Sequence, residues 1–170
     1  MSLATDLLEQ AEHLCRREPR RPRQASLRRS ISAAYYALFH LLVEEASAGV
    51  VAGDATRRGL RPLVGRAYDH GEMRKVCSVW ASGGTLPLSV RDHITFPVSA
   101  DLRLVAETFL QMQSFRHTSD YDTGRDFGRS ETDIFIGQVR AAFAAWGRVR
   151  GTADARTFLL ALLLWNRWTR

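Results

Sequence analysis

The residues most able to do chemistry fall into two groups, and the first lies within residues 29–40. At helical spacing, Arg29, Ser32, Tyr36 and His40 share one face, within about 80° of one another. The arginine could bind phosphate, the tyrosine could stack against a base and the histidine could carry a proton. A solvated face with ordinary hydrogen bonds is the simpler interpretation. The opposite face is apolar and is expected to contact the core, through Leu27, Ile31, Ala34, Tyr35, Leu38 and Leu42.

The second group comes near the end of another predicted helix. At helical spacing, Gln113, Arg116 and Asp120 share one face, and His117 and Tyr121 lie side by side on the next face. An ordinary ion pair between Arg116 and Asp120 would contribute only about 0.3–0.5 kcal/mol. A binding or catalytic cluster is the alternative interpretation of the same side chains.

Acidic residues at the end of this second helix call for a compensating cation. Asp120 and Asp122 oppose the helix dipole, which places partial negative charge at the C-terminus. The candidates for the cation are Arg116, Arg29 and Arg125. We therefore expect the two groups of residues to face each other, because unpaired buried charges are costly.

Length and composition indicate one soluble domain over residues 1–170, with 45% hydrophobic residues. The first residues lack the basic and apolar regions of a signal peptide, and the longest apolar run, 158–165, is shorter than a bilayer span. Cys15 and Cys77 form no spaced framework. We expect a cytoplasmic protein without a membrane segment.

The formal net charge of +6 invites an interpretation as a nucleic-acid-binding protein. Every basic residue except Lys75 is arginine, a bias that a GC-rich genome also produces. Seven arginines nevertheless cluster around two prolines: Arg16, Arg17, Arg20, Arg21, Arg23, Arg28 and Arg29. The cluster is either a solvated loop between helices or a patch that attracts phosphate, and both interpretations remain open.

Several other kinds of site have no signal in the sequence. The five histidines show no metal-ligand spacing such as an i,i+4 pair. The chain has no phosphate-binding loop, no dinucleotide fingerprint and no nucleophile elbow. We therefore predict neither a metal site nor a cofactor.

Apolar residues recur with a helical period along most of the chain. The periodicity and the capping signals at Ser99, Ser130 and either Thr152 or Asp154 predict helices over 3–18, 24–48, 54–67, 72–81, 99–122, 130–147 and a last one that begins at 152 or 154 and includes 158–165. Residues 82–98 are expected to form a connection with a short extended piece near 93–96. The pattern predicts an all-α protein, an antiparallel up-down bundle of five to seven helices built on 24–48 and 99–122.

Both polar groups lie in motifs that resemble those of one helical family. RSISAAYYALFH (29–40) resembles the first long helix of HEPN domains, with its Ala-Tyr-Tyr-Ala core and aromatic–His pair. RHTSDYD (116–122) is similar to the Arg…Ala-Asp-Tyr-Asp element of a non-toxin branch of the family. The resemblance covers about residues 24 to 149. It implies a HEPN-like up-down bundle in which the two motifs lie on the two long helices.

The resemblance also carries implications for activity. Many HEPN proteins are RNases in which an Arg is followed, after four to six residues, by a His. Arg116 matches the Arg, but Tyr121 and Asp122 stand where the His would be. This implies a non-catalytic module that binds a nucleotide, RNA or a partner. The alternative is a metal-independent RNase using Arg116 with His117 or His40. The implied ligand-binding residues are Arg29, Tyr36, His40, Arg116, Asp120, Tyr121 and Asp122.

Partners are implied in the same way. HEPN domains are often dimeric and often pair with a nucleotidyltransferase-like protein, in arrangements resembling toxin–antitoxin pairs. We therefore expect a homodimer or such a partner. The apolar run 158–165 fits this expectation, since it must be covered either by its own helices or by a second copy.

Overall fold

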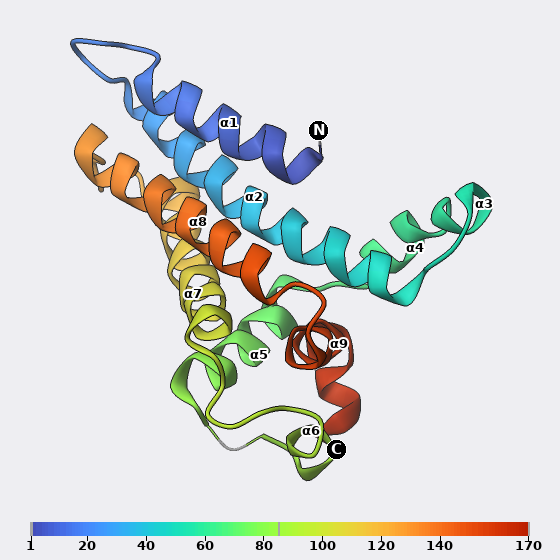
Figure 1. Ribbon diagram of the computed structural model, residues 1–170. Helices are drawn as coiled ribbons and strands as arrows, with labels where there is room; N and C mark the ends of the chain where they lie inside the picture. Colours follow the sequence, from blue (N-terminus) through green and yellow to red (C-terminus); the bar gives the residue numbers. More distant parts are fainter. Residues whose placement is uncertain (1, 85, 170) are drawn as a thin grey trace. The chain divides into compact units, whose positions relative to one another are not determined.

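The computed structural model describes residues 2–84 and 86–169, which form helices and contain no strand (Figure 1). The predicted all-α class is confirmed. The helices of the described part are α1 (Leu3–Arg16), α2 (Gln24–Val50), α3 (Ala55–Arg58), α4 (Arg61–Gly65), α5 (His70–Ser82), α6 (Leu88–Arg91), α7 (Ala100–Tyr121), α8 (Arg129–Val149) and α9 (Ala153–Trp168).

The chain divides into two compact units that share the long helices. Unit 1 comprises Met1–Leu41 and Thr108–Ala144, and unit 2 comprises Leu42–Glu107 and Ala145–Arg170. Each of α2, α7 and α8 therefore contributes one segment to each unit. The single domain over 1–170 stays a prediction.

In unit 1, α1 lies along the first part of α2 (Figure 1). The Ser30 hydroxyl donates to the Ala11 carbonyl at 2.7 Å, and the Ser26 hydroxyl donates to Glu18 Oε1 at 2.9 Å. Earlier residues of α2 thus contact later residues of the α1 region. Ser30 is fully buried, so the first bond satisfies a hydroxyl that would otherwise cost about 1–3 kcal/mol.

The first part of α8 contacts α1 with a similar reversal of numbering. Arg16 Nη2 lies 3.5 Å from Asp133 Oδ1, and Arg140 pairs with Glu12 one turn earlier in α1. These ion pairs are exposed, and exposed pairs contribute only about 0–1 kcal/mol each. These pairs therefore add little to the stability of the protein, and their value here is that they show which residues of α1 and α8 lie opposite each other.

Aromatic and aliphatic side chains fill the interior of unit 1. The Tyr35 ring of α2 lies 5.6 Å from the Phe109 ring of α7, centre to centre, and both side chains are fully buried. Phe115 of α7 stacks on Phe135 of α8 at 3.9 Å. The predicted core face of α2 is confirmed, because each of its members is buried: Leu27, Ile31, Ala34, Tyr35, Leu38 and Leu42.

In unit 2, α5 packs on α9 through aromatic rings. Trp80 lies 5.5 Å from Phe158 and 5.9 Å from Trp165, centre to centre, and it is only 1% exposed. The apolar run 158–165 therefore closes the core of its own unit. Within this run, Leu160 is 40% exposed.

The connections differ from the sequence prediction in two places. The helix expected over 54–67 is two short helices, α3 and α4, because Pro62 fits only the first turn of a helix and lies there in α4. The extended piece expected near 93–96 is wrong. Residues 86–99 instead contain the short helix α6 followed by turns, and no described strand is available to pair with an extended segment.

Of the predicted helix caps at Ser99, Ser130 and Thr152, two are present in the structure. Ser99 Oγ accepts the Leu102 N–H at 3.3 Å, and Thr152 Oγ1 accepts the Ala155 N–H at 3.1 Å, so these two caps are confirmed. The predicted cap at Ser130 is wrong, since α8 already begins at Arg129. None of the described helices is both long and apolar enough to cross a membrane.

Candidate functional site

The two groups of polar residues meet inside unit 1, as predicted. Arg116 of α7 donates through Nη2 to the Tyr36 hydroxyl of α2 at 3.1 Å. The Ser32 hydroxyl of α2 donates to Asp120 Oδ1 at 2.6 Å. Later residues of α2 thus contact earlier residues of α7. The short second bond joins a hydroxyl to a carboxylate, which is among the stronger hydrogen bonds in proteins.

Arg116 is held on several sides. Its Nε lies 2.9 Å from Asp120 Oδ2, and the two side chains are only 26% and 20% exposed. The guanidinium carbon lies 5.5 Å from the centre of the Tyr36 ring and 5.9 Å from that of Tyr121, within cation–π range. Arg116 is therefore the cation that compensates Asp120, and its charge is largely engaged within the fold.

Arg28 is the important residue that the sequence did not single out. Its Nη1 donates to the carbonyls of Ser119 and Asp122 at 2.9 Å each, and its Nη2 donates to the Arg125 carbonyl. A helix leaves its last carbonyls without intrahelical donors, and a cation at this end also complements the dipole. Arg28 of α2 thus caps the end of α7.

Arg29 was predicted to face the end of α7, and this is wrong. Arg29 is exposed, while the contacts predicted for it are made by Arg28, one position earlier. Neighbouring helical residues point about 100° apart, so only one of the two can face α7. Arg29 is thereby left on the solvent side of α2.

The remaining predicted residues lie on or near the surface. His117 is exposed and its ring lies 5.0 Å from that of Tyr121, which is 65% exposed. The His40 ring lies 6.4 Å from the ring of Tyr36. Asp122 accepts the Gly124 N–H at 3.0 Å through Oδ1 and closes a local turn. The cluster therefore combines a fixed interior, centred on Arg116, with an exposed histidine and tyrosine.

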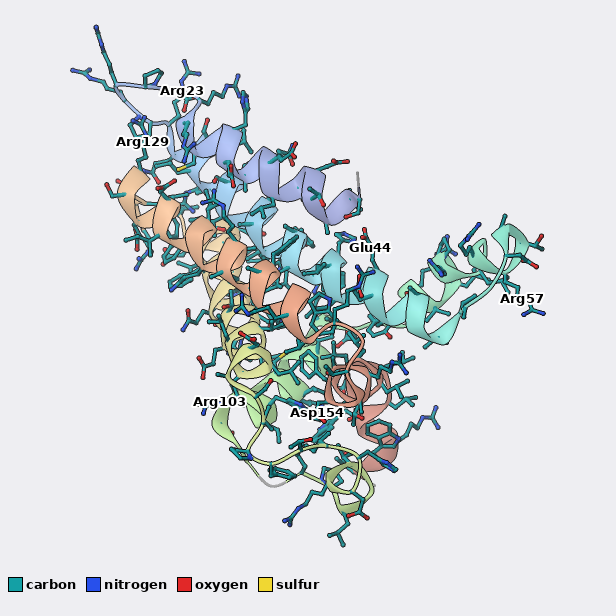
Figure 2. All side chains as sticks on the ribbon, in the orientation of Figure 1. Arg23, Glu44, Arg57, Arg103, Arg129 and Asp154 are labelled. Atoms are coloured by element: carbon teal, nitrogen blue, oxygen red, sulfur yellow. The ribbon has the colours of Figure 1, made fainter. Side chains whose placement is uncertain are left out.

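The α1–α2 loop presents a second basic surface. Arg129 donates to the carbonyls of Glu18 and Pro19 and thereby fastens the loop to the start of α8. Arg129 and Arg23, which belongs to the loop, are labelled in Figure 2. The other arginines of this loop are exposed: Arg20, Arg21 and Arg23. We call these three the loop arginines. Their guanidinium groups are available to a ligand.

Glu18 anchors the same loop through its carboxylate. Burial disfavours its charged form, but the Ser26 hydroxyl and the Arg23 N–H donate to it. Together with the charges of Arg17 and Arg23, these bonds hold the pKa of Glu18 below its usual value. A carboxylate in this position stays charged at neutral pH and keeps the loop closed.

Glu18→Gln is expected to destabilise the protein at neutral pH, and the difference should disappear in acid. The folded pKa lies below the unfolded pKa, so the stabilisation is present above the unfolded pKa and is lost as the pH falls through the folded pKa. Urea unfolding at several pH values checks this, with Glu9→Gln as the exposed control. A difference that does not change with pH would contradict the prediction.

Within the described residues, no group of three or more His, Cys, Asp or Glu side chains is arranged to hold a metal ion. Cys77 is fully buried in unit 2, and burial raises the pKa of its thiol. A thiol that stays protonated is a poor nucleophile. Cys77 is thus a core residue, as the sequence suggested.

No protein-family model, no curated protein and no solved structure matches this chain. The arguments for its function therefore depend on the residues of the chain itself.

Proposed function

We propose that the chain is a HEPN-like, antiparallel up-down helical module of the cytoplasm that binds single-stranded RNA or a nucleotide without cleaving it. The observation that carries this proposal is the set of exposed loop arginines on a fastened loop. Arginine binds phosphate oxygens through paired N–H donors, and a loop that is already ordered loses less entropy on binding. The reversed numbering of the α1–α2 and α2–α7 contacts supports the up-down arrangement.

Two neighbouring features add to the attraction for phosphate. The loop leads into the N-terminus of α2, where the helix dipole places partial positive charge. Arg29 is exposed within the second turn of the same helix. Exposed Tyr121, on α7 of the same unit, offers an aromatic face on which a base could stack. Phosphate and base contacts together distinguish a nucleotide from a simple anion.

The state of Arg116 argues against catalysis. Its guanidinium already contacts the Asp120 carboxylate and the Tyr36 hydroxyl, so it would have to leave both to stabilise a phosphate in a transition state. His117 is exposed on the side of Tyr121, where water can screen it. We therefore assign Arg116 to holding α7 against α2.

The RNase remains the second candidate, and one observation favours it. Tyr36 accepts a bond from Arg116, and its ring lies near that of His40, so an arginine and a histidine flank one phenol. Cleavage of RNA by the pure protein, lost in Arg116→Ala, would establish this activity. A partner, either a second copy or a nucleotidyltransferase-like protein, is also part of the proposal, and the mass of the pure protein in solution tests the homodimer.

Replacing the three loop arginines with glutamine is expected to weaken binding of a labelled single-stranded RNA at least tenfold at low salt. Each phosphate contact to a single strand contributes a slope of about −0.7 to the plot of log affinity against log salt. Losing three contacts should therefore flatten the slope by about 2. Fluorescence anisotropy across a salt series measures both quantities.

The matched control removes the same charge from exposed arginines of unit 2: Arg57→Gln, Arg58→Gln and Arg66→Gln. If the control loses as much affinity as the loop variant, the attraction is due to net charge and the loop is not a binding site. If neither RNA nor ATP binds the unaltered protein, the proposal fails. Multiple-turnover cleavage would favour the RNase instead.

A further inference from the structure

Unit 2 contains a cavity of about 330 Å³ that the RNA proposal does not use. The end of α2 and the first half of α9 form its walls, together with Tyr68 from the segment between α4 and α5. Most of the lining is apolar and includes Ala46, Val50, Leu159 and Leu160. Small-molecule sites have volumes of about 300–1,000 Å³ and apolar walls with few polar groups.

Tyr68 is an unusual member of this wall. The residue is 7% exposed, and its hydroxyl has no hydrogen-bond partner within the described part of the chain. Burial raises the pKa of Tyr68 to about 12, so the phenol stays protonated at neutral pH, and its oxygen is too deeply buried to contact a ligand in the cavity. A buried hydroxyl without a partner costs stability, and most buried polar groups in folded proteins are bonded.

Arg156 supplies a charge to the same cavity. It lies in the lining, is exposed and belongs to the first turn of α9, close to the positive end of that helix. The lining contains no acidic residue that would neutralise it. The opposite wall, at Gly49 and Val50, is the negative end of α2, which disfavours an anion there. An anionic group is therefore favoured on the α9 side.

We propose that this cavity binds an amphipathic monocarboxylate, with its acid group at Arg156 and its acyl chain against the apolar wall. One guanidinium can donate two parallel N–H bonds to a single carboxylate. A polyphosphate needs several more donors than this lining provides, and a neutral alcohol would leave Arg156 without an anion. The site lies wholly in unit 2 and does not depend on the proposed function.

Isothermal titration of the full chain with decanoate tests the proposal, with decan-1-ol and ATP as the comparison ligands. Decanoate is expected to bind about tenfold or more tightly than decan-1-ol, because only the acid forms charge-assisted hydrogen bonds. Titration with ATP is expected to give the same heat for the unaltered chain and for Arg156→Gln. Equal affinity for decanoate and decan-1-ol would overturn the proposal, since the site would then be merely apolar.

Single substitutions test Arg156 and the wall. Arg156→Gln should weaken decanoate binding about tenfold, whereas Arg167→Gln, an exposed arginine of the same helix, should leave it within about twofold. Tyr68→Phe should leave decanoate binding within about twofold and the thermal midpoint equal or higher, because it removes an inaccessible hydroxyl without a partner. Loss of decanoate binding in Tyr68→Phe would overturn the placement of the acid group at Arg156.

A variant that narrows the cavity without unfolding the chain distinguishes loss of binding from loss of folding. Ala52 lines the cavity yet is exposed, so Ala52→Phe can narrow the site without disturbing the core. This variant should lose decanoate binding and keep the circular dichroism spectrum of the unaltered chain. Full binding by Ala52→Phe, or equal binding by Arg156→Gln and Arg167→Gln, would overturn the proposal. RNA binding is measured separately, so the two proposals can fail independently.

Discussion

Trp80→Ala is expected to lower the free energy of unfolding by about 3–5 kcal/mol, because it removes the central side chain of unit 2. Trp80 is 1% exposed and lies against Phe158 and Trp165 of α9. The substitution loses the transfer free energy of the indole and leaves a cavity that the surrounding helices fill only in part. A loss of this size is a large fraction of the stability of an ordinary domain.

Urea unfolding followed by circular dichroism measures the effect of Trp80→Ala. Leu88→Ala is the control, because Leu88 is a large apolar residue of the same unit that is 77% exposed. The control should change the free energy of unfolding by less than about 0.5 kcal/mol. If the two variants were equally stable, α5 and α9 would not form the core of unit 2.

The sequence was sufficient to predict the long helices and their buried faces. The positions of α2 and α7 follow from apolar residues at helical spacing, and local caps such as Ser99 set where α7 begins. These features depend on residues within one or two turns of each other. Such short-range patterns are visible in a single sequence.

The sequence was not sufficient where the answer depends on how helices pack. Arg28 and Arg29 are neighbours of identical type, and the position of α7 decides which of them caps it. The expected motif contacts at Tyr36 and Arg116 were found, whereas the role of Arg28 was missed. No local signal distinguishes adjacent arginines, because the choice depends on residues about 90 positions away.

The cavity in unit 2 was missed for a similar reason. Its walls come from three segments that are far apart in the chain, and Tyr68 lies between two helices where no periodicity marks it as buried. Arg156 looked like one of many arginines in a basic chain. Only the packing of α2 with α9 places these residues together.

Asp120→Ala is expected to lower the free energy of unfolding by about 2–4 kcal/mol, the second large effect that we predict. The substitution leaves the half-buried Arg116 without its anion and the Ser32 hydroxyl, in a residue that is 4% exposed, without its acceptor. Groups that lose a partner inside a fold cost more than the net value of the bond. Asp120 makes both the ion pair with Arg116 and the hydrogen bond from Ser32, so the single substitution removes both contacts between α7 and α2 and within α7.

The same helix provides the matched control. Arg103 and Glu107 form another i,i+4 pair on α7, but their side chains are 51% and 43% exposed. Glu107→Ala should therefore cost no more than about 0.5 kcal/mol, as exposed helical pairs do. The burial of the Arg116–Asp120 pair is the main difference between the two sites, so the comparison isolates its contribution.

A double-mutant cycle shows whether Asp120 acts through Arg116. Arg116→Met keeps the length of the side chain and removes the charge, so the double variant should cost about 0.5–3 kcal/mol less than the sum of the two single variants. Additive effects would mean that the pair contributes nothing to holding α7 against α2. Arg116 would then be available for a ligand, and the argument that its charge is engaged within the fold, on which the non-catalytic proposal depends, would fail.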